Sequence, residues 1–273
     1  MHSTPKKTTS TPAAEPEEIR LNHLLAQVGI ASRRACDEII AAGRVRVDGR
    51  IVREMGTRVV VGVNTIEVDG ASIGRPPKRI VLLMHKPKGF VTTVTDPEGR
   101  PTVADLVRQV ARKQRLFPVG RLDVNTTGAL LMTNDGYLCY KLTHPRYGIP
   151  RVYHVRVRGR FDDTTARRLE RMAQEGHTRV RSARSSGTRS RPGVELVAKL
   201  QKETILKVTL LEGRNRQVRN MIEAVGLRVT ELKRVSFGPV SVRKLPVGGI
   251  RPLDRRELER LEAAVKGQAG GNR

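Results

Sequence analysis

The sequence predicts an α+β protein with a small N-terminal unit and a larger unit built on a mainly antiparallel mixed sheet. Strand-like runs with alternating apolar residues outnumber helical patterns, and short turns separate many of them. A Pro-rich linker at residues 75–79 separates residues 19–74 from residues 80–262. Residues 1–18 are expected to form a disordered tail and residues 263–273 a flexible one.

The charge of the chain favours a polyanionic partner. Its 273 residues include 52 Lys and Arg against 27 Asp and Glu, a formal net charge of +25. Nucleic acid is the first candidate. An anionic membrane is disfavoured, because no apolar run approaches the roughly 18 residues of a membrane span and the basic residues are not gathered on one amphipathic face.

The two cysteines indicate a reducing compartment. Cys36 and Cys139 are far apart in the sequence, and no apolar leader suggests export, so we expect reduced thiols in a cytoplasmic protein. Cys139 and His144 lack a second pair of residues at ligand spacing, so no metal site is expected.

The N-terminal unit is expected to open with two short helices. Apolar residues from Leu21 to Val28 recur at helical spacing, and Ser32 is placed to cap a second helix that ends at Gly43. A tight turn at Asp48 and Gly49 then joins two short strands, and extended chain follows at residues 59–63 and 65–68.

This unit resembles the S4 RNA-binding module. The likeness rests on the run from Arg20 to Arg34 and on residues 43–49. The resemblance implies that Arg20, Arg33, Arg34 and Arg44 present a basic surface to structured RNA, helped by a helix start that favours phosphate. The alternative is that these arginines only solvate the surface.

In the larger unit, Asp123 is expected in a loop between two buried strands. Residues 116–119 lead into Gly120, and residues 130–132 lead away from the loop. Further strands are expected at residues 80–84, 91–95, 153–157, 206–210, 229–237 and 240–245. Helices are expected to begin at Thr102, Asp162 and Asp254 and to cover residues 218–225. Residues 177–193 are expected to form a mobile basic excursion, that is, a long Arg-rich loop.

The residues alone leave the role of Asp123 open. A single aspartate can act as a nucleophile, a general base, a metal ligand or half of a structural ion pair. The sequence has no phosphate-binding Gly-x-x-x-x-Gly-Lys loop and no Gly-x-Gly-x-x-Gly after a strand, so nucleotide cofactors are not expected.

Residues 120–136 resemble the catalytic motif of the pseudouridine synthases, in the branch that carries an N-terminal S4 module and acts on ribosomal RNA. Residues 86–89, the strand with Tyr153, and residues 212–219 match further family segments in the expected order. Ala129 departs from the leucine usual in this branch, and the segment after His177 has no matching motif. The likeness extends from residue 19 to about residue 260 and implies the pseudouridine synthase fold.

The resemblance makes Asp123 the catalytic residue of a cofactor-free reaction that detaches uracil from ribose, rotates it and rejoins it through carbon. With an ordinary pKa of about 3.9, an aspartate is ionised at neutral pH and can attack; attack on the sugar and attack on the base both remain open. The resemblance assigns Tyr153 to stacking on the uracil and to a later proton transfer, and Arg219 to an ion pair with Asp123. The alternatives are a core aromatic for Tyr153 and a phosphate contact for Arg219.

The same resemblance extends to RNA contacts. Arg121 is expected to fill the space that a flipped nucleotide leaves, and Lys86, Arg214 and Arg216 to bind RNA. The chain has no Trp and only four Tyr and four Phe, so a broad aromatic stacking platform is not expected. Recognition is expected to depend on charge and RNA shape.

The predicted function is therefore pseudouridine formation in ribosomal RNA by a monomer. Residues 96–103 resemble the members that act on the large subunit, which favours 23S rRNA. The alternatives are the same reaction on 16S rRNA and a non-catalytic S4-domain protein in ribosome assembly. The expected partner is ribosomal RNA or a precursor of a ribosomal subunit, without a membrane, a metal or a small-molecule cofactor.

Overall fold

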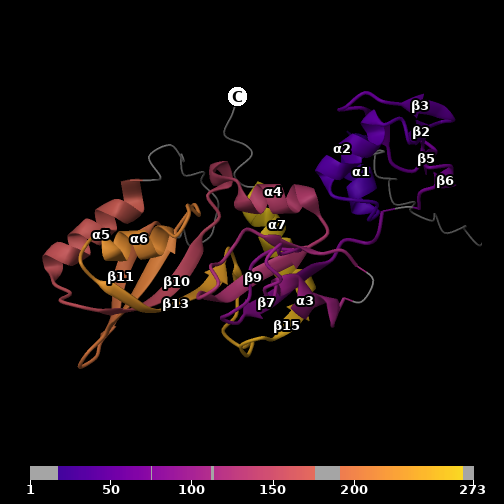
Figure 1. Cartoon of the computed structure of the whole chain (residues 1–273). Helices are drawn as coiled ribbons and strands as arrows, with labels where there is room; N and C mark the ends of the chain where they lie inside the picture. Colours follow the sequence, from indigo (N-terminus) through magenta and orange to yellow (C-terminus); the bar gives the residue numbers. More distant parts are fainter. Residues whose placement is uncertain (1–17, 75, 112–113, 176–190, 267–273) are drawn as a thin grey trace, which may run out of the picture. The chain divides into compact units, whose positions relative to one another are not determined.

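The computed structural model describes residues 18–74, 76–111, 114–175 and 191–266. The chain divides into two compact units, Met1–Lys78 and Arg79–Arg273 (Figure 1). The predicted N-terminal tail lies outside the described residues except for its last residue, and so does most of the predicted basic excursion. Within the described residues, no helix has the length and apolar character needed to cross a membrane.

The N-terminal unit packs two helices against short strands. Its core contains leucines of the first helix, Cys36 and Ile40 of the second, and valines and isoleucines of the strands. The elements are β1 (Glu18–Arg20) paired with β4 (Arg58–Val60), α1 (Leu21–Gln27), α2 (Arg33–Ala41), and a sheet of β3 (Arg50–Val52), β2 (Val45–Val47), β5 (Ile66–Val68) and β6 (Ala71–Ser72) in that spatial order.

Local signals in this unit are confirmed, with one exception. Ser32 Oγ accepts a hydrogen bond of 3.2 Å from the amide of Ala35. Asp48 and Gly49 have φ of 50° and 78°, as a tight hairpin turn requires. The extended chain predicted at residues 59–63 ends at Val60, because Asn64 Oδ1 accepts the Val60 amide at 2.7 Å and turns the chain.

The C-terminal unit is built on a nine-stranded mixed sheet, and its predicted mainly antiparallel character is confirmed. Of the described strand pairs in this sheet, β13 with β9 is parallel and the others are antiparallel. The spatial order is β11 (Gly193–Lys199), β12 (Thr204–Leu210), β10 (Arg151–Arg158), β13 (Arg228–Phe237), β9 (Thr127–Thr133), β7 (Val81–Lys86) and β15 (Ile250–Pro252), with β14 (Val240–Ser241) on β13 and β8 (Phe117–Val119) on β9.

Strand β9 is buried on both faces of this sheet. Leu130 and Met132 belong to one apolar core, whereas Ala129 and Leu131 belong to a second. The first core includes side chains of α3 (Val103–Arg108), α5 (Asp163–Glu175) and α6 (Gln217–Glu223), and the second includes side chains of α4 (Gly136–Thr143) and α7 (Arg255–Lys266). A strand enclosed in this way gives the loop before it a fixed anchor.

Most predicted helix starts in this unit are confirmed. Thr102 and Asp105 form a capping box, and the side chains of Asp162 and Asp254 accept amides of the first turns of α5 and α7. The predicted strand at residues 91–95 is wrong, because Val91 makes only an isolated bridge to Thr102 before the chain turns at residues 96–100. The last helix continues to Lys266, past the predicted boundary at residue 263, because Val265 is buried in the core.

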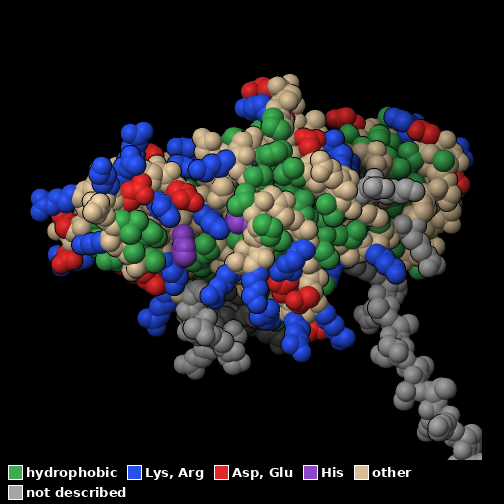
Figure 2. All heavy atoms as spheres, turned by 90° about the horizontal axis from the view of Figure 1, so that it is seen from below, with side chains coloured by type: hydrophobic (Ala, Val, Ile, Leu, Met, Phe, Trp, Pro, Cys, Tyr) green, Lys and Arg blue, Asp and Glu red, His purple; other side chains and the backbone are tan. Residues whose placement is uncertain are grey.

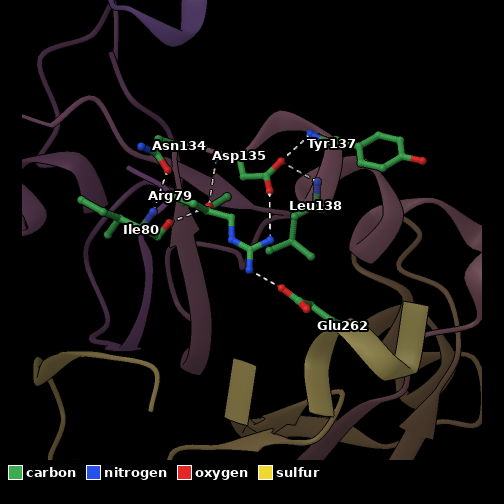
Figure 3. A network of polar contacts seen from close by, with 8 residues as sticks. Arg79, Ile80, Asn134, Asp135, Tyr137, Leu138 and Glu262 are labelled. Carbon is green, nitrogen blue, oxygen red and sulfur yellow. Dashed lines mark hydrogen bonds and ion pairs between the residues drawn. The ribbon is translucent and has the colours of Figure 1, made fainter. Parts of the chain in front are cut away.

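A polar network fixes α4, which the sequence did not predict, to the rest of the unit (Figure 3). The Arg79 guanidinium contacts Glu262 of α7 and lies 3.7 Å from Asp135. The Asp135 carboxylate caps α4 by accepting the amides of Tyr137 and Leu138, each at 2.9 Å. The start of β7 and the N-terminus of α4 are thereby held together.

Candidate active site

Asp123 lies in the tight loop between β8 and β9. The Thr126 amide donates to the Asp123 carbonyl at 3.0 Å and closes a turn around it. The preceding residue, Leu122, is held by Thr92, whose hydroxyl donates to the Leu122 carbonyl at 2.6 Å and accepts the Leu122 amide at 3.3 Å. The loop backbone is therefore fixed on both sides of Asp123, whose side chain is 39% exposed.

Lys86 supports this loop from beneath. Its Nζ donates to the carbonyls of Pro87, Asp123, Val124 and Thr126 at 2.9, 3.2, 3.3 and 3.1 Å. Its side chain is fully buried, so the prediction that Lys86 binds RNA is wrong. Lys86 is a positioning residue that ties the end of β7 to the backbone of the loop.

The burial of Lys86 gives the protein a testable pH dependence. Burial lowers the pKa of Lys86 to about 8, and the charge of Asp123 only partly opposes this shift. In the unfolded chain the pKa of lysine is about 10.4. Below pH 8 Lys86 is charged in both states, and burial of its ammonium lowers the free energy of unfolding by the full amount. Between pH 8 and pH 10.4 the folded protein gives up this proton while the unfolded chain keeps it, so the free energy of unfolding rises with pH.

We therefore expect the stability of the wild type to rise relative to Lys86→Met across this pH window, by up to about 3 kcal/mol. Urea unfolding at successive pH values measures the difference between the two proteins. Lys88→Met, which alters an exposed neighbour, is the control and should follow the wild type. A difference in the free energy of unfolding between the wild type and Lys86→Met that does not change with pH would contradict this explanation.

Arg219 contacts the Asp123 loop at two points. Its Nε lies 3.7 Å from Asp123 Oδ2, and its guanidinium donates to the Asn125 carbonyl at 3.4 Å. Only 14% of the Arg219 side chain is exposed, because α6 places it beside the buried Val218. A largely buried guanidinium in this position places a positive charge beside the Asp123 carboxylate and restricts its orientation.

Asp123 opens onto two adjoining hollows. The smaller, of about 60 Å³, is lined by Tyr153 and the apolar side chains of Leu210, Val218 and Leu232. The larger, of about 370 Å³, is lined by Thr92, Asn125 and Arg219 among others. Both share Arg121, Leu122, Asp123 and Arg216. The structure therefore brings Asp123, Tyr153 and Arg219 to one place.

Tyr153 lies on the apolar face of β10, as the alternation predicted, and two buried arginines lie behind it. Arg234 Nε donates to the Ala129 carbonyl at 2.7 Å, and the guanidinium of Arg151 donates to backbone carbonyls that include those of Leu142 and Thr143. Burial lowers the pKa of Arg151 to about 10 and lowers that of Arg234, and the nearby Tyr153 opposes both shifts. The Tyr153 side chain is therefore fixed in a strongly positive setting.

Sequence reasoning missed these two arginines, although one signal was present. Alternate residues of a strand point to the same face, so the alternation that placed Tyr153, Val155 and Val157 on the buried face also placed Arg151 there. Arg234 similarly follows the buried Leu232 by two residues.

The remaining predicted RNA contacts are exposed. Arg121, Arg214 and Arg216 surround the hollows, with Arg214 Nε 2.7 Å from Glu212. In the N-terminal unit Arg20, Arg33 and Arg34 are exposed, whereas Arg44 is bound by Asp69 at 2.6 Å. Lys and Arg side chains are spread over the face shown in Figure 2. In the described segments, no three His, Cys, Asp or Glu residues form a group that could hold a metal ion.

The chain matches proteins of one family over most of its length. Residues 80–224 match the RNA pseudouridylate synthase family, and residues 19–63 match the S4 domain. The chain is 38% identical to the ribosomal large subunit pseudouridine synthase B of Bacillus subtilis, over 89% of this chain and 96% of that protein. It is 36% identical to an uncharacterized RNA pseudouridine synthase of Aquifex aeolicus, over 91% and 95% of the two chains.

A solved structure agrees with the sequence comparisons. A crystal structure of a pseudouridylate synthase superposes with a TM-score of 0.55 at 25% identity, covering 89% of this chain and 99% of that one. The protein therefore belongs to the RNA pseudouridylate synthase family and is a pseudouridine synthase with an N-terminal S4 domain.

Proposed function

We propose that this enzyme converts one uridine of 23S rRNA to pseudouridine and that Asp123 is its nucleophile. The observation that carries the proposal is the placement of Asp123 beside Arg219 at the opening of the hollow lined by Tyr153. Relatives named for the large ribosomal subunit support the choice of RNA. A net charge of +25 is suited to a phosphate-rich partner.

In this proposal the target nucleotide leaves its stack and its uracil enters the hollow. The Tyr153 ring packs on the base, and the apolar side chains of Leu210 and Leu232 exclude water around it. Arg121 fills the space left in the RNA, while Arg214 and Arg216 bind the flanking phosphates.

The chemical steps then follow from the charges in the site. The Asp123 carboxylate, oriented by Arg219, attacks the nucleoside, and the glycosidic bond electrons depart with the uracil as a delocalised anion. The base rotates in the hollow and rejoins the ribose through carbon. As the new carbon–carbon bond forms, the bond from the ribose to Asp123 breaks and the carboxylate is released unchanged. The hydrogen on the bonded carbon is then removed as a proton, with Tyr153 as the proposed relay, and the ring nitrogen that left the ribose takes up a proton from water.

The proposal is tested with 23S and 16S transcripts that carry tritium at carbon 5 of uridine. Pseudouridine formation releases this label to water, so the wild type should release label from 23S rRNA and not from 16S rRNA. Release from 16S rRNA alone would overturn the choice of RNA. Binding to both RNAs without release from either would support a non-catalytic assembly protein.

The S4 domain is proposed to supply phosphate contacts through Arg20, Arg33 and Arg34. Replacing all three by alanine should weaken binding to 23S rRNA and reduce the slope of log affinity against log salt by about 0.7 to 0.9 for each phosphate that is no longer neutralised. The triple lysine variant keeps the charges and should retain most of the slope. Filter binding at a series of salt concentrations measures both variants, and an unchanged slope in the alanine variant would contradict this role.

A further inference from the structure

Thr126 carries a buried hydroxyl whose hydrogen-bonding capacity is unused. The residue is 1% exposed, and its Oγ1 has no hydrogen-bond partner among the described residues. Other buried threonines of this unit do have partners. The Thr92 hydroxyl donates to the Leu122 carbonyl at 2.6 Å, and the Thr133 hydroxyl donates to the Ile80 carbonyl at 2.7 Å. Because a buried hydroxyl without a partner destabilises a folded protein, its presence here indicates a partner that arrives from outside the chain.

The backbone of Thr126 fixes the position of this hydroxyl. Its amide donates to the Asp123 carbonyl at 3.0 Å, and its carbonyl accepts a hydrogen bond from Lys86 Nζ at 3.1 Å. Both backbone groups of Thr126 therefore have partners within the described loop and strand. The hydroxyl is the polar group of this residue that remains available.

Thr126 lines the smaller of the two hollows, together with Asp123 and Tyr153. Much of the remaining wall is apolar and is formed by Leu210, Val218 and Leu232. A base that enters this hollow leaves water for an apolar wall. Each polar atom of the base that finds no partner there weakens binding, so a free hydroxyl in the wall has a use.

The amide side chain of Gln217 also lines this hollow but is already engaged. Its Oε1 accepts the amide of Arg214 at 3.1 Å, and its Nε2 donates to Glu212 at 3.4 Å. These bonds hold the Gln217 amide against its own loop. The Thr126 hydroxyl is therefore better placed than the Gln217 amide to bind a polar atom of the base.

We propose that Thr126 Oγ1 donates a hydrogen bond to a carbonyl oxygen of the target uracil. The inference rests on the proposed reaction and adds a substrate-binding residue to its site. Uracil has carbonyl groups at positions 2 and 4, on either side of N3. The half-turn of the base that exchanges N1 for C5 also exchanges these two carbonyls. A hydroxyl whose proton can reorient therefore meets a carbonyl both before and after the rotation, without any movement of the backbone.

Thr126→Val separates this role from a structural one. Valine has nearly the shape of threonine, and its introduction breaks no hydrogen bond of the described protein, so the variant should unfold at the same urea concentration as the wild type or at a higher one. Its single-turnover rate of pseudouridine formation should fall about tenfold or more, because a buried carbonyl of the base loses its donor. Thr126→Ser keeps the hydroxyl and should react within a few fold of the wild type.

Thiouridines at the target position test whether the hydroxyl acts on the base itself. Sulfur is a weak hydrogen-bond acceptor, so replacing the carbonyl oxygen at position 2 or position 4 removes the acceptor from the RNA. At least one of these substitutions should slow the wild type more than it slows Thr126→Val, which has no donor to lose. Effects of sulfur on the size and reactivity of the base are common to both enzymes and cancel in this comparison.

Three results would each overturn the inference. They are a lower urea midpoint for Thr126→Val, which would give the hydroxyl a role in the fold, an equal rate of Thr126→Val and wild type on uridine, and an equal slowing of both enzymes by both thiouridines. Wild-type activity on 23S rRNA accompanied by any of these results refutes the inference alone. Absence of wild-type activity on 23S rRNA refutes the proposed function on which the inference rests.

Discussion

Replacing Asp123 by asparagine should lower the single-turnover rate of pseudouridine formation by roughly a thousandfold or more. The amide has the shape of the carboxylate but is a poor nucleophile and carries no charge. It also leaves the largely buried Arg219 without its carboxylate partner. Rates of tritium release from labelled 23S rRNA, with enzyme in excess over RNA, measure the chemical step without product release.

Two controls separate chemistry from folding and binding. The Asp123 side chain is 39% exposed and its ion pair is 3.7 Å long, so its loss should change the free energy of unfolding by no more than about 1 kcal/mol. RNA affinity should also remain within a few fold of the wild type, because the exposed arginines around the hollows are unchanged. A variant that folds, binds and still reacts within tenfold of the wild-type rate would exclude Asp123 as the nucleophile.

Replacing Gly128 by alanine should cause a large loss of stability for the addition of a single methyl group. Gly128 is the second residue of β9, which is buried throughout, and has a φ of +117°; a Cβ there would clash with the Arg234 carbonyl oxygen. The obstacle is backbone on the neighbouring strand β13, so the parallel contact between β9 and β13 must open. We expect a loss of at least about 4 kcal/mol in the free energy of unfolding, together with loss of activity.

Gly226→Ala is the matched control for this variant. Gly226 also has a positive φ, of +78°, but a Cβ there meets nothing within 4 Å. It should therefore lose only the backbone strain, about 1 to 2 kcal/mol. Urea unfolding of both variants measures the difference. Equal losses in the free energy of unfolding would mean that β9 and β13 can move apart without a further loss of stability.

The sequence predicted the parts of the fold that depend on local patterns. The alternation around Tyr153 identified a strand and its buried face, and the cap residues Ser32, Thr102 and Asp162 identified helix starts. These signals are reliable because one side chain and a neighbouring amide determine each of them. The Asp123 loop was likewise placed correctly between two strands, since buried strands leave a strong apolar signature.

The sequence could not predict features that depend on contacts between distant segments. Lys86 was expected at the RNA, because nothing in its neighbourhood shows that loop carbonyls from residues 123–126 will enclose its ammonium. Helix α4 was missed because only Leu138 and Leu142 are buried among residues that include two exposed tyrosines. The pairing of Arg219 with Asp123 was expected from resemblance alone, and the structure supplies its geometry.

Mapping the modification in cells is the sharpest test of the proposal that this enzyme isomerises one uridine of 23S rRNA through Asp123. Ribosomal RNA from a strain that lacks the gene is compared with RNA from the same strain supplied with the wild type or with Asp123→Asn. Carbodiimide treatment followed by reverse transcription marks pseudouridines as stops. We expect one additional stop in 23S rRNA with the wild type and none with the variant, whereas identical stop patterns in all three RNAs would contradict the proposal.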